Sequence, residues 1–227
     1  MALIIGIDDS GRGPLIGPMI LAGVLVDADQ EKILKKSEVK DSKMLTHAQR
    51  LELGKIIEKN IIDKKIVKAS PKEIDEAVNS GTNLNTLEAM KTAEIINYFT
   101  KKNKNKKISI VIDCPSVNKI MWGNKMMTFL ENTENLDIRC EHKADRDYVA
   151  VSAASILAKN MREEEVAKIK KEYGPIGSGY PADPVTKEFL KNHGKRLADS
   201  GIFRKSWATW KALFPEKSQA TLGDFKN

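Results

Sequence analysis

The sequence predicts an α/β domain built around a mixed central sheet. Strand-like apolar runs come first and helical patterns are interleaved later, which is typical of that class. The chain has 227 residues, of which 41% are hydrophobic, enough for one sizeable core. We see no internal repeat. We therefore expect one folded domain over residues 1–214 and a flexible tail over 215–227, which begins at a helix-stopping proline.

The first half of the chain favours three strands and a helix. The apolar runs 2–8 and 18–26 predict consecutive strands, joined by a turn at residues 11–13 whose glycines permit unusual backbone angles. A helix capped by Thr46 should run to about Lys59. A third strand is expected at 61–68.

The second half favours more helix. Ser70 and Pro71 open a short helix, as N-cap and first helical residue. Residues 85–99 place four apolar side chains at helical spacing, which indicates a core-facing side; they are Leu87, Met90, Ala93 and Ile96. The remaining expectations are strands at 108–112 and 136–141, a long helix at 148–173, a Gly/Pro-rich loop at 174–184, and helical segments at 186–197 and 206–214.

Four acidic residues stand where predicted strands end. Asp8 and Asp9 close the first strand, Asp113 closes a later one, and Asp145 follows the strand around Ile138. Carboxylates that converge at strand ends repel one another unless cations neutralise them. Hard oxygen ligands without a convincing His or Cys set favour two Mg²⁺ or Mn²⁺ ions over zinc. The alternatives are a solvated strand end for the Asp pair and an Asx-turn cap for Asp113.

Composition narrows the function classes. No apolar run approaches the roughly 20 residues of a membrane span, so we expect a cytoplasmic protein, and a monomer. Cys114 and Cys140 show no CxxC spacing and read as reduced core thiols. A net charge of +7 permits an anionic partner without specifying one. The lysine-rich run at 101–107 reads as a solvated loop.

Seven segments, taken in order, resemble the ribonuclease HII family and specifically its archaeal branch. Any one of them could arise by chance, whereas seven in the family's order are highly specific. They cover residues 6–14, 39–46, 112–113, 141–145, 151–159, 177–184 and 204–207. The resemblance implies the ribonuclease H-like fold, a mixed five-stranded sheet flanked by helices with a C-terminal helical extension. It also implies cleavage of the RNA strand of RNA/DNA hybrids and cleavage 5′ of ribonucleotides embedded in duplex DNA.

The resemblance also implies roles for individual residues. Asp8, Asp9, Asp113 and Asp145 fall on the family's metal ligands, with two Mg²⁺ or Mn²⁺ ions expected per site. The positions that match substrate contacts are Gly11, Arg12 and Gly13, which would inspect the ribose 2′-hydroxyl, Tyr180, which would pack on the sugar next to the junction, and Lys43 and Lys143, which would bind phosphate. Without the resemblance, Tyr180 reads as a loop tyrosine held by packing.

The chain departs from the family pattern at the second acidic position. Asp9 stands where the family usually has Glu, so the side chain is one methylene shorter, by about 1.5 Å. This change keeps a second interpretation open, a catalytically impaired nucleic-acid-binding module of the same fold. Retention of all four acidic positions argues for the enzyme.

The tail resembles the peptide that docks on the sliding clamp of DNA replication. Gln219, Leu222 and Phe225 follow its spacing, in which the two apolar residues share one face of a helical turn. Lys226 stands where the motif often has a second aromatic residue, and so short a pattern also arises by chance. The resemblance implies a clamp as a possible partner.

Overall fold

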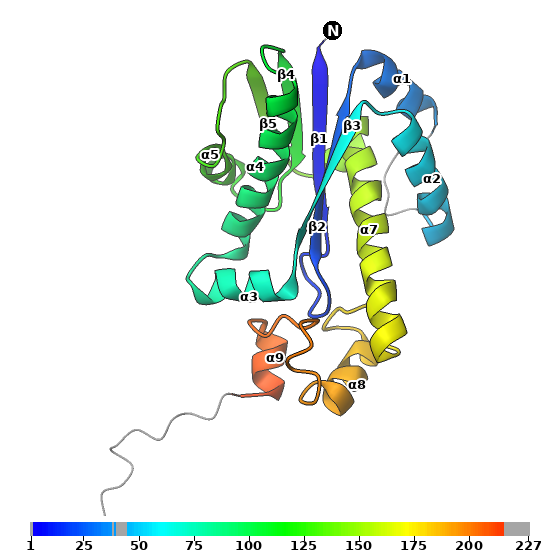
Figure 1. Cartoon of the computed structure of the whole chain (residues 1–227), viewed down its shortest axis with the longest axis vertical. Helices are drawn as coiled ribbons and strands as arrows, with labels where there is room; N and C mark the ends of the chain where they lie inside the picture. Colours follow the sequence, from blue (N-terminus) through cyan, green and yellow to red (C-terminus); the bar gives the residue numbers. More distant parts are fainter. Residues whose placement is uncertain (1, 38, 40–44, 216–227) are drawn as a thin grey trace, which may run out of the picture.

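A twisted five-stranded sheet forms the centre of the computed structural model, which describes residues 2–37, 39 and 45–215 (Figure 1). The strands lie in the order β3-β2-β1-β4-β5. β1 pairs antiparallel with β2, and β2 with β3, whereas β1–β4 and β4–β5 are parallel. The expected mixed sheet is confirmed. The strand bounds are β1 Leu3–Ser10, β2 Met19–Val26, β3 Asp63–Ala69, β4 Ile108–Asp113 and β5 Leu136–Glu141.

Helices cover both faces of the sheet. On one face α4 and α5 bury Phe99 and Trp122 against Ile5 and Ile7 of β1. On the other face α7 packs with α1 and α2 over the outward side chains of β2. The bounds on these two faces are α1 Ala28–Lys36, α2 His47–Lys59, α3 Pro71–Asn79, α4 Leu84–Lys102, α5 Lys119–Met127, α6 Ala144–Asp147 and α7 Val149–Tyr173.

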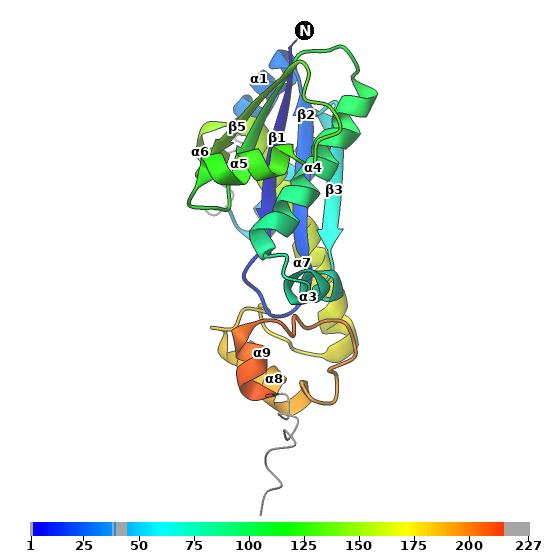
Figure 2. The same ribbon diagram turned by 90° about the vertical axis from the view of Figure 1, so that its left-hand side faces the viewer.

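A C-terminal extension lies beyond the end of the sheet where β1 finishes (Figure 2). It contains α8 Pro184–His193 and α9 Ala208–Leu213. Phe189, Phe203 and Trp210 form a separate cluster of buried side chains with Leu15 and Ile16, which belong to the β1–β2 connection. The extension is therefore anchored on the segment that follows the first pair of aspartates.

Local sequence explains where several helices begin. Thr46 accepts a hydrogen bond from the amide of Gln49 and forms a capping box, and Ser70 caps α3 with Pro71 at the first helical position, as predicted. Each cap satisfies amides that the first helical turn leaves without partners.

Apart from the four-residue α6, two helices were not predicted from the sequence, α1 and α5. Each begins at a side-chain cap, Asp27 for α1 and Asn118 for α5. Leu34 is the one buried residue of α1, so the sequence of this helix shows almost no apolar residues at helical spacing. The expected core position of Met90 is also wrong. That side chain is 44% exposed, and Ala89 takes the buried place beside it.

Candidate active site

The register of the sheet places the first acidic residues together. Ile7 of β1 lies opposite Ile112 of β4 in a parallel pair. The next residue on each strand is an aspartate, so Asp8 and Asp113 lie side by side toward the carboxyl edge of the sheet. This is the edge at which open α/β sheets place their ligands.

Asp8 and Asp9 are held in an environment that disfavours their charge. Burial, and next the neighbouring Asp9, raise the pKa of Asp8 well above its usual value, although a hydrogen bond from Ser155 opposes the shift. Burial likewise raises the pKa of Asp9 to about 6, against the lowering effect of the Arg12 guanidinium. Ser155 is fully buried in α7. Its contact with Asp8 shows a polar role as well.

Asp145 lies on α6, which follows β5 and is tied to Asp113. The carboxylate of Asp113 accepts a hydrogen bond from the amide of Ala144 at 3.1 Å. It thus fastens the start of α6 across 31 residues of sequence. Asp145 is only 1% exposed, and its backbone carbonyl accepts a hydrogen bond from Ser152. The fourth acidic residue is therefore fixed next to the third.

A small hollow joins three of these carboxylates. Asp8, Asp9 and Asp113 line it, together with apolar groups of Ile7 and Trp122. Carboxylate oxygens that raise one another's pKa are a donor set suited to a hard divalent cation. Within the part of the chain that the structure describes, no group of three or more His, Cys, Asp or Glu side chains is arranged to hold an ion as it stands.

The turn after β1 contacts the loop that carries Tyr180. Gly11 has φ +90°, and a Cβ there would lie 2.6 Å from the side chain of Arg162. A Cβ on Gly13 would touch the Tyr180 ring at 3.4 Å. The amide of Leu15 also donates to the carbonyl of Gly179 at 2.8 Å. The structure thus places Gly13 against Tyr180, and Gly11 against Arg162.

Arg204 fixes this turn through hydrogen bonds, a structural role that the sequence analysis did not predict. Its side chain is fully buried and donates to the carbonyl oxygens of Gly11 at 2.6 Å, Arg12 at 2.7 Å and Gly17 at 3.1 Å. Trp207 donates to the carbonyl of Gly13 at 3.2 Å. The signal was present, because Arg204 and Trp207 lie in the last matching segment, but nothing in their spacing assigns a contact.

The side chain of Arg12 turns toward α4. It forms an ion pair with Glu88 and donates to Asn85 Oδ1 at 2.6 Å. Neither α4 residue was expected at the site. They stand three apart on the first turns of α4, so their side chains project from one side of the helix.

Tyr180 and Lys143, two other predicted substrate residues, do not line the acidic hollow. Tyr180 is 42% exposed, and the Arg162 guanidinium lies 5.3 Å from its ring centre. Lys143 is exposed and adopts a left-handed backbone conformation immediately before α6. The remaining predicted site residues lie outside the described residues; they are Lys43, Gln219, Leu222 and Phe225.

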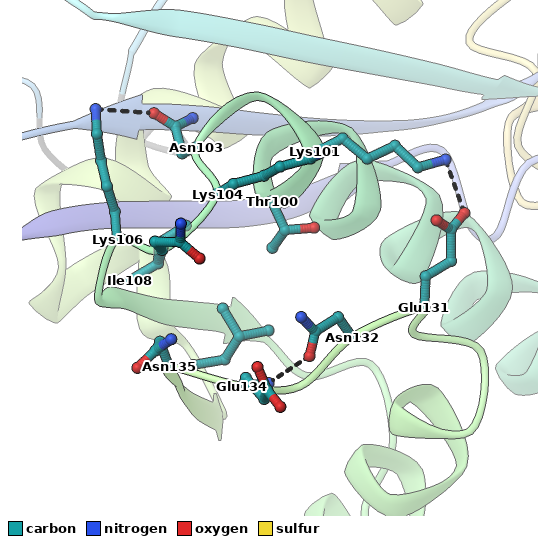
Figure 3. A pocket seen from close by; sticks show the side chains of 12 residues that line it. Thr100, Lys101, Asn103, Lys104, Lys106, Ile108, Glu131, Asn132, Glu134 and Asn135 are labelled. Carbon is teal, nitrogen blue, oxygen red and sulfur yellow. Dashed lines mark hydrogen bonds and ion pairs between the residues drawn. The ribbon is translucent and has the colours of Figure 1, made fainter.

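A second, larger hollow lies at the opposite end of the sheet and is separate from the acidic residues. It surrounds Ile108, where β4 begins, whereas Asp113 ends that strand (Figure 3). Lysines of the 101–107 run line it, but Lys101 pairs with Glu131 at 2.8 Å and Lys106 bonds Asn103 at 3.3 Å. Of these two lysines, Lys101 has its charge balanced by a carboxylate, whereas Lys106 bonds a neutral amide.

A sheet of this order, with acidic residues at the carboxyl ends of β1 and β4 and after β5, defines the class of ribonuclease H-like nucleases. The family model for ribonuclease HII matches residues 5–210. A ribonuclease HII of Methanococcus maripaludis strain C6 is 44% identical over 223 residues, covering 97% of this chain and 90% of that protein. The chain belongs to the ribonuclease HII family and is a nuclease, hence a hydrolase.

Solved structures agree with this assignment. The ribonuclease H2 of Pyrococcus horikoshii OT3 superposes with a TM-score of 0.82 at 36% identity, covering 93% of this chain and 96% of that one. A ribonuclease HII from Archaeoglobus fulgidus, solved in a complex with PCNA, gives 0.79 at 33% identity and covers 98% and 100%. The ribonuclease H-like fold is thereby confirmed. Among the described helices, none has the length and apolar character needed to cross a membrane.

Proposed function

We propose that this protein hydrolyses the RNA strand of RNA/DNA hybrids and cuts duplex DNA on the 5′ side of an embedded ribonucleotide, leaving a 3′-hydroxyl. Its role would be the removal of ribonucleotides from DNA. The observation that carries the proposal is the position of the turn at 11–13 between the acidic hollow and Tyr180. A group that inspects the sugar thus adjoins the groups that would act on the phosphate.

Asp8, Asp9, Asp113 and Asp145 would hold two Mg²⁺ or Mn²⁺ ions. When bound, such a pair supplies an activated water and stabilises the leaving 3′ oxygen. Ser155 and Ala144 keep Asp8 and Asp113 at the edge of the sheet through hydrogen bonds. The shared positive charge would also allow all four carboxylates to remain ionised at neutral pH.

Selectivity for the ribose would come from the turn and from Tyr180. The 2′-hydroxyl is the group by which a protein tells RNA from DNA. Because the side chain of Arg12 is engaged by Glu88 and Asn85, the turn would present its backbone to the sugar. Tyr180 would pack on the adjoining sugar, and Lys43 and Lys143 would bind phosphates.

We also propose a sliding clamp as a partner of the tail. The structure of the Archaeoglobus fulgidus ribonuclease HII is of its complex with PCNA. In this chain the motif residues Gln219, Leu222 and Phe225 follow Pro215, past the last described helix. An apolar pair at helical spacing is a recognised way to fill a groove on a partner.

A single cleavage gel tests the nuclease proposal. The full chain is incubated with a labelled DNA duplex that contains one ribonucleotide, in Mg²⁺, in Mn²⁺ or in chelator. We expect one product cut 5′ of the ribonucleotide, only with metal, and no cut in the all-DNA duplex. Binding of the duplex without cleavage in either metal would instead support the impaired binding module.

A further inference from the structure

Glu88 is a buried carboxylate that faces the same hollow as the acidic site. It comes from α4, is only 1% exposed, and lines the hollow with Asp8, Asp9 and Asp113. Burying a carboxylate is costly unless its oxygens receive cations or hydrogen-bond donors. The partners of Glu88 therefore indicate what the hollow is built to receive.

The two carboxylate oxygens of Glu88 differ in their contact with Arg12. Oε2 pairs with Nη1 of Arg12, whose Nη2 donates to Asn85 on the same helix. Both oxygens are buried and neither accepts a hydrogen bond from the described residues, so the ion pair with Arg12 is the contact that distinguishes Oε2 from Oε1. Arg12 thus provides a cationic partner for Oε2. Oε1 has no hydrogen-bond donor among the described residues and lies beside three other carboxylates.

We propose that Glu88 is a fifth carboxylate of the cation site, with Oε1 available to a bound divalent ion or to its water. This inference rests on the proposed function, because it requires cations in the hollow. Carboxylates around a metal site commonly orient its ligands and waters, and their loss typically lowers metal affinity by about 10–100-fold. A carboxylate confined with three others is also stabilised by the ion that they share.

The competing explanation is that Glu88 serves only to hold Arg12. Removing its charge would then release the Arg12 guanidinium toward Asp9, whose pKa Arg12 already lowers. Metal affinity would fall through Arg12 rather than through Glu88. The two explanations separate when Arg12 is replaced, because an effect that acts through Arg12 disappears with it.

The experiment is calorimetric titration of the metal-stripped full chain with MnCl₂ near neutral pH. Glu88→Gln removes the charge at nearly constant size, and Glu88→Asp keeps the charge but withdraws it by one methylene. Glu94→Gln, on the same helix with a side chain 48% exposed, is the matched control. The pair Arg12→Gln and Arg12→Gln/Glu88→Gln repeats the comparison without the guanidinium. Thermal melts confirm that each variant is folded, and the upward shift of the melting temperature by Mn²⁺ gives a second measure of binding.

We expect Glu88→Gln and Glu88→Asp to weaken Mn²⁺ binding on the order of tenfold or more. Glu94→Gln should change it less than about twofold, as an exposed charge does. The loss should persist when Arg12 is Gln. Wild-type affinity in Glu88→Gln, wild-type affinity in Glu88→Asp, or a loss that vanishes without Arg12 would each overturn the inference. A wild-type chain that binds no Mn²⁺ would instead overturn the proposed function.

Discussion

Arg204 donates a hydrogen bond to the carbonyl oxygen of Gly11 at 2.6 Å, although 193 residues separate them. The bond joins the C-terminal extension to the turn that follows the first two aspartates. Because Arg204 has no exposed surface, water cannot replace the donors that it supplies to this turn. The extension therefore helps to fix the position of groups on the catalytic sheet.

Replacing Arg204 should destabilise the protein and impair cleavage together. Arg204→Met leaves three carbonyl oxygens, two of them in buried bonds, without this donor, which should lower the free energy of unfolding by about 2–4 kcal/mol. Denaturant titration measures the change. Arg196→Met is the control, because Arg196 is exposed and its hydrogen bond within the described part of the chain is a long one, 3.4 Å, to His193. Equal unfolding of the two variants would show that the anchoring bonds contribute nothing.

The acidic residues should be needed for cleavage but not for folding. Asp8→Asn, Asp113→Asn and Asp145→Asn should each abolish activity, because each removes a metal-binding charge. The metal-free variants should fold as well as the parent chain or better, since the neutral amide relieves carboxylate repulsion. Activity gels and melts in chelator measure the two effects. Near wild-type cleavage by any variant in Mg²⁺ would remove that residue from the catalytic set.

The metal-free protein should lose stability as the pH rises from about 4 to about 6. Burial raises the folded pKa of Asp9 from 3.8 to about 6, so the folded chain holds this proton more tightly than the unfolded chain does. Stability is then fully present below the unfolded pKa and is lost as the pH rises through the folded pKa. The loss attributable to Asp9 should reach up to about 3 kcal/mol.

Denaturant titrations in chelator across this pH window measure that loss. Asp9→Asn should flatten the profile, whereas Asp199→Asn, whose side chain is 99% exposed, should not. Saturating Mn²⁺ should also flatten it, because a bound cation favours the ionised carboxylates. An unchanged slope in Asp9→Asn would mean that Asp9 ionises freely in the folded protein.

Three strands, β1, β2 and β4, could be predicted readily from the sequence because they are short apolar runs with acidic or turn residues near their ends. The structure then shows that Ile7 pairs with Ile112, which places the aspartates that follow them side by side. Glu88 and Arg204 could not be found in this way. Their partners lie 76 and 192 positions away at Arg12, a pairing that depends on how α4 and the extension pack.

Lengthening Asp9 tests whether its short side chain affects the choice of metal. A shorter carboxylate should hold an ion more loosely, and Mn²⁺ tolerates less regular coordination than Mg²⁺ does, which demands near-ideal octahedral geometry. Mn²⁺ should therefore support relatively faster cleavage by the parent chain, and Asp9→Glu should narrow the Mn²⁺ to Mg²⁺ rate ratio. Initial rates in each metal measure the ratio. If it stays the same or widens, the backbone of β1 already compensates for the missing methylene.

The tail should bind the sliding clamp without taking part in cleavage. Leu222 and Phe225 stand three apart, so in a helical turn they would enter one apolar pocket while Gln219 supplies hydrogen bonds. Phe225→Ala should remove clamp binding in calorimetry and leave cleavage of free duplex unchanged. Lys217→Ala, upstream of the motif, should bind as the parent chain does. Equal clamp affinity with and without residues 216–227 would assign any clamp contact to the folded part of the protein instead.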